Sequence, residues 1–311
     1  MSELWNTITR QVALLLASFL PAERRIALDR RLRGREEYRK LRLADAVVVS
    51  YGKSGRTWLR VMLSRYLKLV YGLRGERLLG FDNFHRRDAR IPRIFFTHDN
   101  YLRDYRGDER SRRDFADKRV VLLVRSPQDT AVSQYFQWKH RMRPQKKRIN
   151  RYPAHGTDVS VYDFVMRPES GLPKVLDFMN GWAEQIPHLK EALVLRYEDL
   201  RADPEGSLRR VVRFLGTPDD PAAARDAVEY ASVENMRQLE EKRTFWLAGR
   251  RMTPKDKSNP DSFKVRRAKV GGYRDYFDEA QAARIDALVR GRLSPVYGYT
   301  DEVRVAPEGE R

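Results

Sequence analysis

The feature that most constrains this chain is a short strand that runs into a glycine-containing turn and then a helix, over residues 47–68. Three β-branched residues, Val47 to Val49, are typical of a buried parallel strand. After the turn, side chains recur with the 3.6-residue helical period, at Trp58, Val61, Met62, Arg65, Tyr66 and Leu69. The first N–H groups of such a helix lack internal partners and carry partial positive charge. The segment therefore predicts a binding site for an anion such as phosphate.

The turn does not have the spacing of the loop that binds nucleoside triphosphates. That loop requires G-x-x-x-x-G-K-[ST], and Val47 occupies the position of its first glycine. The order of residues instead resembles the 5′-phosphosulfate loop of the sulfotransferase family, Y-P-K-S-G-T-T-W. Gly52 stands in place of the family's proline and Arg56 in place of its first threonine. The resemblance implies that Lys53, Ser54, Gly55, Arg56, Thr57 and Trp58 bind the donor 3′-phosphoadenosine 5′-phosphosulfate (PAPS), with Lys53 and residues 54–57 at its 5′-phosphosulfate. From this stretch alone, a different phosphate loop stays open.

Strand and helix patterns alternate along the rest of the chain. Further apolar segments predict strands over residues 93–98, 119–125 and 192–197. This alternation predicts an α/β fold, a layered domain with a central parallel sheet flanked by helices, of the phosphate-loop nucleotide-binding type. We expect that domain over residues 45–300, between an N-terminal helical extension (1–44) and a frayed tail (301–311). Ligands of such sheets bind at the carboxyl ends of the strands.

A second basic position follows the predicted strand 119–125. Arg125 ends that strand, and Ser133 lies two turns into the next helix, which Ser126 is expected to cap. The sulfotransferase pattern R-x-P-x-D-x-x-x-S is intact from Arg125 to Ser133, and the resemblance implies that this pair holds the 3′-phosphate of the donor. Without the Lys53 loop, a strand-ending arginine would be read as a surface charge.

A third basic segment lies near the C-terminus, where residues 266–274 read R-R-A-K-V-G-G-Y-R. It resembles the family's R-K-G-x-x-G-D-W-K, which implies that Arg266 contacts the 3′-phosphate and that Arg267 lies close to it. Ala268 replaces a glycine whose backbone would approach the phosphate, and Gly-Tyr replaces Asp-Trp, so the shape of this loop stays open. Without the family, the segment would be read as a solvated basic run.

Three residues are candidates for contacts with the adenine. By resemblance, Tyr197 in Y-E-D-L meets the base and Trp58 stacks near it, whereas Ser232 matches an adenine-side segment more weakly. An aromatic residue at a strand end or in a helix serves the core equally well, so both readings stay open for Tyr197 and Trp58.

His98 is the candidate for general base, because it follows an apolar strand and an imidazole accepts a proton near neutral pH. Cytosolic-type sulfotransferases place their basic histidine in a K-T-H segment. This chain keeps Thr97-His98 but has Phe96 in place of the lysine, so a positive group at the sulfuryl centre is missing or comes from another residue. The other histidines show no ligand spacing, so we predict no metal.

The resemblance, over roughly residues 45–295, predicts a PAPS-dependent sulfotransferase acting on a hydroxyl or amine. Lys53 and His98 are its expected catalytic residues. Lys plus Arg outnumber Asp plus Glu by 62 to 43, which suits anionic partners. The basic run 139–152, predicted as a loop, favours an anionic acceptor such as a glycan or a lipid-linked sugar. The alternatives are a kinase-like nucleotide-binding protein and a basic nucleic-acid-binding module; under the preferred reading we expect no nucleic acid partner.

The N-terminal residues 4–40 predict one or two amphipathic helices. The apolar face of the first comprises Leu4, Trp5, Ile8, Val12, Leu15 and Leu16. We expect this helix to pack on the domain, with peripheral attachment to a membrane surface as the alternative. The apolar run 12–20 is too short to span a bilayer, and the chain has no cysteine, which fits a cytoplasmic protein. The oligomeric state is left open.

Overall fold

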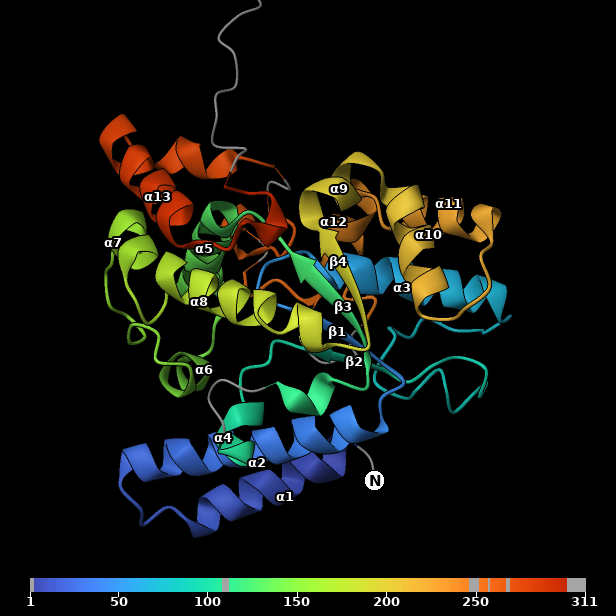
Figure 1. The fold of residues 1–311 in the computed structure, drawn as a ribbon. Coiled ribbons are helices and arrows are strands. Elements are labelled where there is room, and N and C mark those ends of the chain that lie inside the picture. The colour runs from blue at the N-terminus through green and yellow to red at the C-terminus, as the bar shows by residue number, and fades with distance from the viewer. Residues whose placement is uncertain (1–2, 108–111, 246–251, 257, 267–268, 301–311) are drawn as a thin grey trace, which may run out of the picture.

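A parallel sheet forms the centre of the computed structural model, which describes residues 3–107, 112–245, 252–256, 258–266 and 269–300 (Figure 1). Within these residues the sheet has four strands in the order β2-β1-β3-β4. They are β1 (Ala46–Ser50), β2 (Ile94–Thr97), β3 (Arg119–Val124) and β4 (Glu191–Arg196). All neighbouring strands pair in parallel. The four predicted strands and the α/β fold class are confirmed.

Both faces of the sheet are buried, which explains why its strands are apolar at successive positions. Val48 and Val121 point into one hydrophobic core, whereas Val47 and Val120 point into a second core on the other face. Successive side chains of a strand alternate between the faces, so a strand covered on both sides reads as a continuous apolar run. Consecutive valines in β1 are therefore a consequence of this layered arrangement.

Helices cover the two faces in separate groups (Figure 1). The first core is completed by α3 (Arg56–Val70), α9 (Tyr197–Ala202), α10 (Pro204–Phe214), α11 (Pro221–Tyr230) and α12 (Val233–Glu241). The second is completed by α2 (Ala22–Leu43), α4 (Leu102–Arg106), α5 (Pro127–Phe136), α7 (Val161–Met166), α8 (Leu172–Ala183) and α13 (Glu279–Arg292). The remaining α-helices of the described residues are α1 (Glu3–Leu16) and α6 (Pro144–Ile149).

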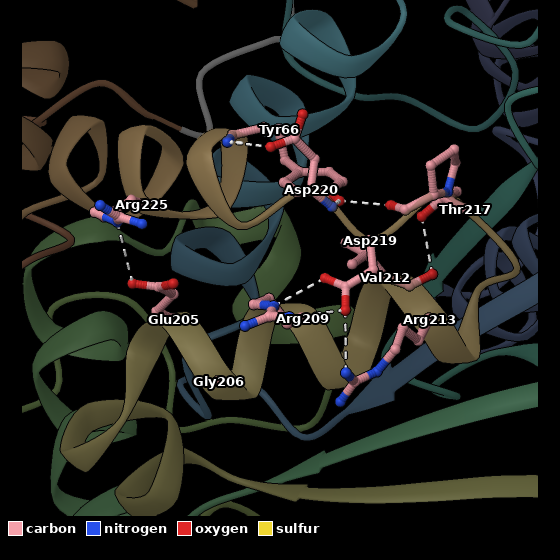
Figure 2. Close-up of polar contacts among 12 residues, drawn as sticks. Tyr66, Glu205, Gly206, Arg209, Val212, Arg213, Thr217, Asp219, Asp220 and Arg225 are labelled. Atoms are coloured by element: carbon pink, nitrogen blue, oxygen red, sulfur yellow. Dashed lines mark hydrogen bonds and ion pairs between the residues drawn. The ribbon is translucent and has the colours of Figure 1, made fainter.

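A polar network fixes α3 against its neighbours on the first face (Figure 2). The Tyr66 hydroxyl of α3 donates to the Pro218 carbonyl at 2.5 Å and accepts from the Asp220 N–H at 2.8 Å, just before α11 begins. Asp219 accepts hydrogen bonds from Arg209 and Arg213 of α10. These contacts tie the C-terminal half of α3 to α10 and to the start of α11.

The N-terminal residues form the two predicted helices, α1 and α2, which lie antiparallel at one edge of the molecule (Figure 1). In α2, Gly34 lies so close to the Tyr101 backbone that an added Cβ would be 2.2 Å from the Tyr101 carbonyl oxygen. That close approach lets α2 pack on α4 and on the second core through Leu41. The apolar stripe of α1 faces solvent at Ile8, Val12, Leu15 and Leu16, whereas the side chains of Leu4 and Trp5 lie outside the described residues.

The prediction of a loop over residues 139–152 is wrong. The chain forms a π-helical turn over Gln137–Arg141 and then α6. Trp138 and Ile149 are buried, and the Lys147 ammonium lies 4.6 Å from the centroid of the Trp138 ring. Lys147 is itself buried against this ring, so a basic residue takes part in the packing and the segment shows no readable apolar period.

Candidate donor and acceptor site

The turn predicted to bind phosphate lies between β1 and α3, and its backbone conformation at position 55 favours glycine. Gly55 caps the N-terminus of α3 with φ +91°. An added Cβ would also lie 2.6 Å from the Tyr197 ring. Ser54 is buried, and Thr57 is half-buried in the first turn of the helix. The N–H groups of this turn thus meet a helix start, which is the arrangement that binds phosphate.

Lys53 is held in a left-handed backbone conformation (φ 76°) and is surrounded by cations. Its ammonium lies 3.5 Å from the Lys264 carbonyl. Burial, together with the charges of Arg141, Arg125 and Arg266, lowers the pKa of Lys53 to about 7, against the opposing charge of Glu240. The structure therefore brings Lys53, Arg125 and Arg266 together, although they lie far apart in the sequence. This concentration of positive charge favours the binding of an anion.

Arg125 joins the turn to the C-terminal basic segment. Its guanidinium donates to the Lys53 carbonyl at 3.4 Å, to the Lys269 carbonyl at 3.0 Å and to the Asp129 carboxylate at 3.1 Å. Asp129 also accepts hydrogen bonds from the N–H groups of Gly271 and Tyr273, both at 2.9 Å. Asp129 thereby fixes the loop after residue 268 beside the sheet, a role that sequence reasoning did not assign although the residue belongs to the quoted pattern.

Arg266 reaches the same region from the other side. Its guanidinium lies over the Phe136 ring, 3.8 Å from the centroid, and contacts the Tyr276 hydroxyl. Phe136 and the half-buried Ser133 both belong to α5 and lie one turn apart, so Arg266 contacts α5 one turn from Ser133. Arg267 and Ala268 lie outside the described residues.

The adenine candidates also come together. The rings of Trp58 and Tyr197 are 6.0 Å apart with an interplanar angle of 66°, and Arg125 lies 4.6 Å above the Tyr197 ring. The Trp58 indole N–H donates to the Ala231 carbonyl at 2.7 Å, which places it beside Ser232. The Ser232 hydroxyl accepts from the Asn235 N–H and caps α12. Ser232 therefore has a structural role as the cap of α12, in addition to its predicted contact with the adenine.

His98 lies at the end of β2 and has both ring nitrogens engaged. Nδ1 lies 2.7 Å from the Ser50 carbonyl, which can only accept, so Nδ1 carries the proton. Nε2 then accepts from the Arg56 guanidinium at 2.5 Å. Burial lowers the pKa of His98 well below its ordinary value, and the charges of Arg56, Lys146 and Lys264 add to this, against the hydrogen bond to Ser50. His98 is thus a neutral imidazole with its basic nitrogen directed at Arg56.

Near this histidine, arginine side chains of α3 lie close to a carboxyl group of α2. Arg60, one turn after Arg56 in α3, stacks its guanidinium 3.9 Å from the centroid of the Phe96 ring. Glu37 of α2 accepts from the Tyr101 N–H; burial and the neighbouring Asp99 raise the pKa of Glu37 to about 8, while Arg56 and Lys40 oppose the rise. The side of the site nearest α2 therefore combines two arginines of α3 with an ionisable carboxyl group from the N-terminal helices.

Sequence reasoning missed an ion pair next to Lys53. Arg141 donates to the Glu240 carboxylate at 2.7 Å, and the side chains are 8% and 0% exposed. Glu240 also accepts from the Lys264 N–H at 2.9 Å and 2.8 Å, and Arg141 contacts the Ser262 and Thr253 carbonyls. The pair thereby fixes the described residues 253–264 over the turn. No local pattern signals it, because Arg141 belongs to the run that was predicted as a loop.

The hydrogen-bond donors of this site fit an anionic nucleotide. Within the described part of the chain, Arg125 Nε is buried without a hydrogen-bond partner, and no cluster of three metal-ligating side chains occurs. Guanidinium and backbone N–H groups are the donors that phosphates require, and two aromatic rings beside them suit a base. None of the helices among the described residues has the length and hydropathy needed to cross a bilayer.

Comparisons with known proteins identify the family to which the chain is similar. A family model described as a sulfotransferase domain matches residues 43–296. Cytosolic sulfotransferase 15 of Arabidopsis thaliana is 26% identical over 208 residues, covering 65% of this chain and 52% of that protein. The 3-alpha-hydroxysteroid sulfotransferase of Cavia porcellus is 22% identical over 262 residues, covering 80% of this chain and 84% of that protein. The match spans little more than half the length of the Arabidopsis protein and of mouse sulfotransferase 2A1.

Solved structures share the fold. Mouse sulfotransferase SULT7A1 complexed with PAP has a TM-score of 0.57 at 21% identity, over 86% of this chain and 94% of that one. Retinol dehydratase in complex with androsterone and the inactive cofactor PAP has a TM-score of 0.51 at 19% identity, over 80% of each chain. Because the family model covers more than half of the sequence, this chain belongs to the sulfotransferase domain family.

Proposed function

We propose that this protein transfers a sulfuryl group from PAPS to an acceptor hydroxyl or amine. The observation that carries the proposal is the convergence of Lys53, Arg125 and Arg266 around the N-terminus of α3. In the reaction, a bond forms between the acceptor oxygen or nitrogen and sulfur. The bond between sulfur and the 5′-phosphate oxygen breaks, and adenosine 3′,5′-bisphosphate leaves.

The residues of the turn act on the leaving phosphate. The N–H groups of residues 54–57 bind the 5′-phosphate, and the ammonium of Lys53 lies where negative charge builds on the bridging oxygen. Arg125, Ser133 and Arg266 hold the 3′-phosphate, with Arg267 nearby, while Trp58, Tyr197 and Ser232 border the adenine. Fixed positive groups aimed at developing charge are usually the largest catalytic contribution, so Lys53→Ala should lower turnover on the order of 100-fold.

His98 is the proposed base. With Nδ1 protonated against Ser50, only Nε2 can take the proton of the acceptor. Arg56 occupies that lone pair at 2.5 Å, so it must move before the transfer occurs. The phosphosulfate oxygens of the donor, bound at the same helix start, would attract Arg56. Arg56 and Arg60 then supply the positive charge that Phe96 cannot, since the family's lysine is absent at that position.

The acceptor class is proposed as an anionic glycan or a lipid-linked sugar. Support comes from cations on one side of the site, where Lys146 and Lys264 lie close enough to lower the pKa of His98. The related structures carry other acceptors, since retinol dehydratase was solved with retinol and with androsterone. A panel of uronic-acid glycans, lipid-linked sugars, steroids and retinol would separate these classes by rate.

A ligand-binding experiment tests the donor without knowledge of the acceptor. Thermal unfolding is measured with adenosine 3′,5′-bisphosphate and with ATP plus magnesium. A ligand at 100 times its dissociation constant adds about 2.7 kcal/mol of stability, so the bisphosphate should raise the melting temperature far more than ATP does. Equal shifts, or a larger shift with ATP, would favour a kinase-like protein. Steeply salt-dependent binding of DNA or RNA, without a bisphosphate shift, would favour a nucleic-acid-binding module.

Turnover then tests the residues. Radiolabelled sulfate transfer by Lys53→Ala and by His98→Ala is compared with the parent protein on the best acceptor of the panel. Near-normal turnover in either variant would remove that residue from its role.

A further inference from the structure

The first helix presents an apolar stripe to solvent. Its members are Ile8, Val12, Leu15 and Leu16, and the stripe continues at Phe19 in the connection to α2. Leu15, Leu16 and Phe19 are 72%, 71% and 82% exposed, the highest values among the exposed large hydrophobic side chains of the described residues. Soluble proteins rarely leave such a run uncovered, so a contiguous stripe of this kind indicates an interaction surface. We call these five residues the hairpin stripe.

The opposite face of α1 accounts for its attachment to the protein. Arg10 pairs at 3.5 Å with Asp29, a buried carboxylate of α2 that also binds Arg33. Ala17, in the turn that follows α1, is buried. The helix is thus oriented by a buried contact toward α2, with the hairpin stripe directed outward. Figure 1 shows α1 as the outermost element on this side, separated from the sheet by α2.

Basic residues border the stripe. A groove of about 450 Å³ runs between α1, α2 and α6, and its lining includes Val12 and Leu15 together with Arg25 and Arg148. Arg24, next to Arg25 at the start of α2, is exposed. The stripe therefore combines apolar side chains with cations at its edge, which is the composition of helices that lie in the interface of an anionic bilayer.

We propose that the hairpin stripe docks this protein on the surface of an anionic lipid bilayer. Ile8, Val12, Leu15, Leu16 and Phe19 enter the boundary between headgroups and acyl chains, and Arg24, Arg25 and Arg148 contact the lipid phosphates. Docking is peripheral, since α1 has 14 residues and a membrane-spanning helix needs about 20.

Charge favours a bilayer over a second copy of this chain as the occupant. The chain carries a formal charge of +19, so an interface between two identical hairpins would bring their arginines together. Like charges in contact oppose association, whereas anionic headgroups neutralise the same arginines.

Vesicle co-sedimentation tests the proposal without any turnover measurement, so its outcome is independent of the sulfuryl-transfer proposal. The full chain is mixed with phosphatidylcholine vesicles and with vesicles that also contain phosphatidylglycerol. We expect binding to the anionic vesicles, weakened as salt rises from about 50 mM to about 500 mM because the charge attraction is screened.

Two sets of variants identify the surface. The triple change Leu15→Glu, Leu16→Glu and Phe19→Glu should weaken binding at least about tenfold, because transferring a large apolar side chain from water is worth more than that factor. The double change Arg25→Glu and Arg148→Glu should remove the preference for anionic vesicles. Leu69→Glu with Val296→Glu, two exposed positions outside the hairpin, is the matched control and should bind like the parent.

Circular dichroism verifies that each variant is folded. We expect all of them to fold, because the substituted side chains lie at the surface. The proposal is overturned if the parent chain does not bind anionic vesicles or if the triple variant binds them as the parent does. A concentration-dependent dimer that the triple variant abolishes, without vesicle binding, would also overturn it and assign the stripe to a second copy.

Discussion

Lys53 gives the most quantitative prediction, because its pKa links donor binding to pH. Burial, together with Arg141, Arg125 and Arg266, lowers the pKa of Lys53 to about 7, so about half of the free protein carries a neutral Lys53 at pH 7. A bound bisphosphate brings several negative charges to this ammonium and should return its pKa toward the ordinary value near 10.4. Binding should therefore take up protons.

The magnitude follows from that linkage. Proton uptake should be about 0.5 per site at pH 7 and about 0.9 at pH 8, which are the fractions of neutral Lys53 in the free protein. Between pH 7 and pH 9, Lys53 must take up a proton before the free protein binds the bisphosphate well. The dissociation constant of adenosine 3′,5′-bisphosphate should then rise about 50-fold from pH 7 to pH 9.

Isothermal titration calorimetry measures both quantities. Titrations in buffers of different ionisation enthalpy give the proton uptake, and titrations between pH 7 and pH 9 give the dissociation constants. Lys53→Met should bind more weakly but lose both the uptake at pH 8 and the rise in dissociation constant. Lys190→Met is the matched control, because Lys190 is exposed and precedes β4 at the opposite end of the sheet.

Two results would contradict the reasoning. Proton uptake near zero at pH 8 in the parent protein would mean that Lys53 is already charged before the anion binds. An unchanged pH dependence in Lys53→Met would mean that another group, such as a phosphate of the ligand, titrates in its place.

Three further predictions concern the surrounding residues. Arg56→Ala should raise the pKa of His98, because burial and Arg56 both oppose its protonation in the parent protein. The acid side of the pH–rate profile should therefore move to higher pH. NMR titration of the five histidines, with His98→Asn for assignment, measures the pKa directly, and an unchanged pKa of His98 would count against the contact. Gly55→Ala should abolish the thermal shift that the bisphosphate causes. The φ of +91° and the Tyr197 ring, 2.6 Å from an added Cβ, both exclude a side chain at this position. A normal thermal shift would show that the turn tolerates a side chain there. Glu240→Ala should lower the free energy of unfolding by about 3 to 5 kcal/mol because it leaves the buried Arg141 without its carboxylate partner. Arg209→Ala, which breaks the exposed pair with Asp219, should have a far smaller effect. Urea denaturation compares them, and equal losses would refute the distinction.

The pH dependence of stability has a sign that can be checked. The pKa of His98 is lower in the folded protein than its unfolded value near 6.5, so the unfolded chain binds the proton more readily. Stability is therefore retained above about pH 6.5 and lost as pH falls below it, by about 1.4 kcal/mol per unit at the steepest. His98→Asn should remove this part of the acid sensitivity.

The strand positions and the strand–turn–helix geometry around Gly55 could be predicted from the sequence. Continuous valines predict a strand covered on both faces, and a glycine next to a helix start predicts an anion site, because both follow from local backbone geometry. The ordered basic motifs around Lys53, Arg125 and Arg266 also predict a common ligand. These inferences depend on residue type and on short spacings, which the sequence contains in full.

Other features were decided only when distant segments packed together. The contact between Arg56 and His98 joins residues 42 positions apart in the sequence, and the Arg141–Glu240 pair joins residues 99 positions apart. The outward direction of the hairpin stripe was likewise not predicted, since an amphipathic pattern shows that a helix has an apolar face but not what covers it. Burial and the fields of neighbouring charges set the pKa of Lys53 and of His98, and both arise only from the tertiary structure.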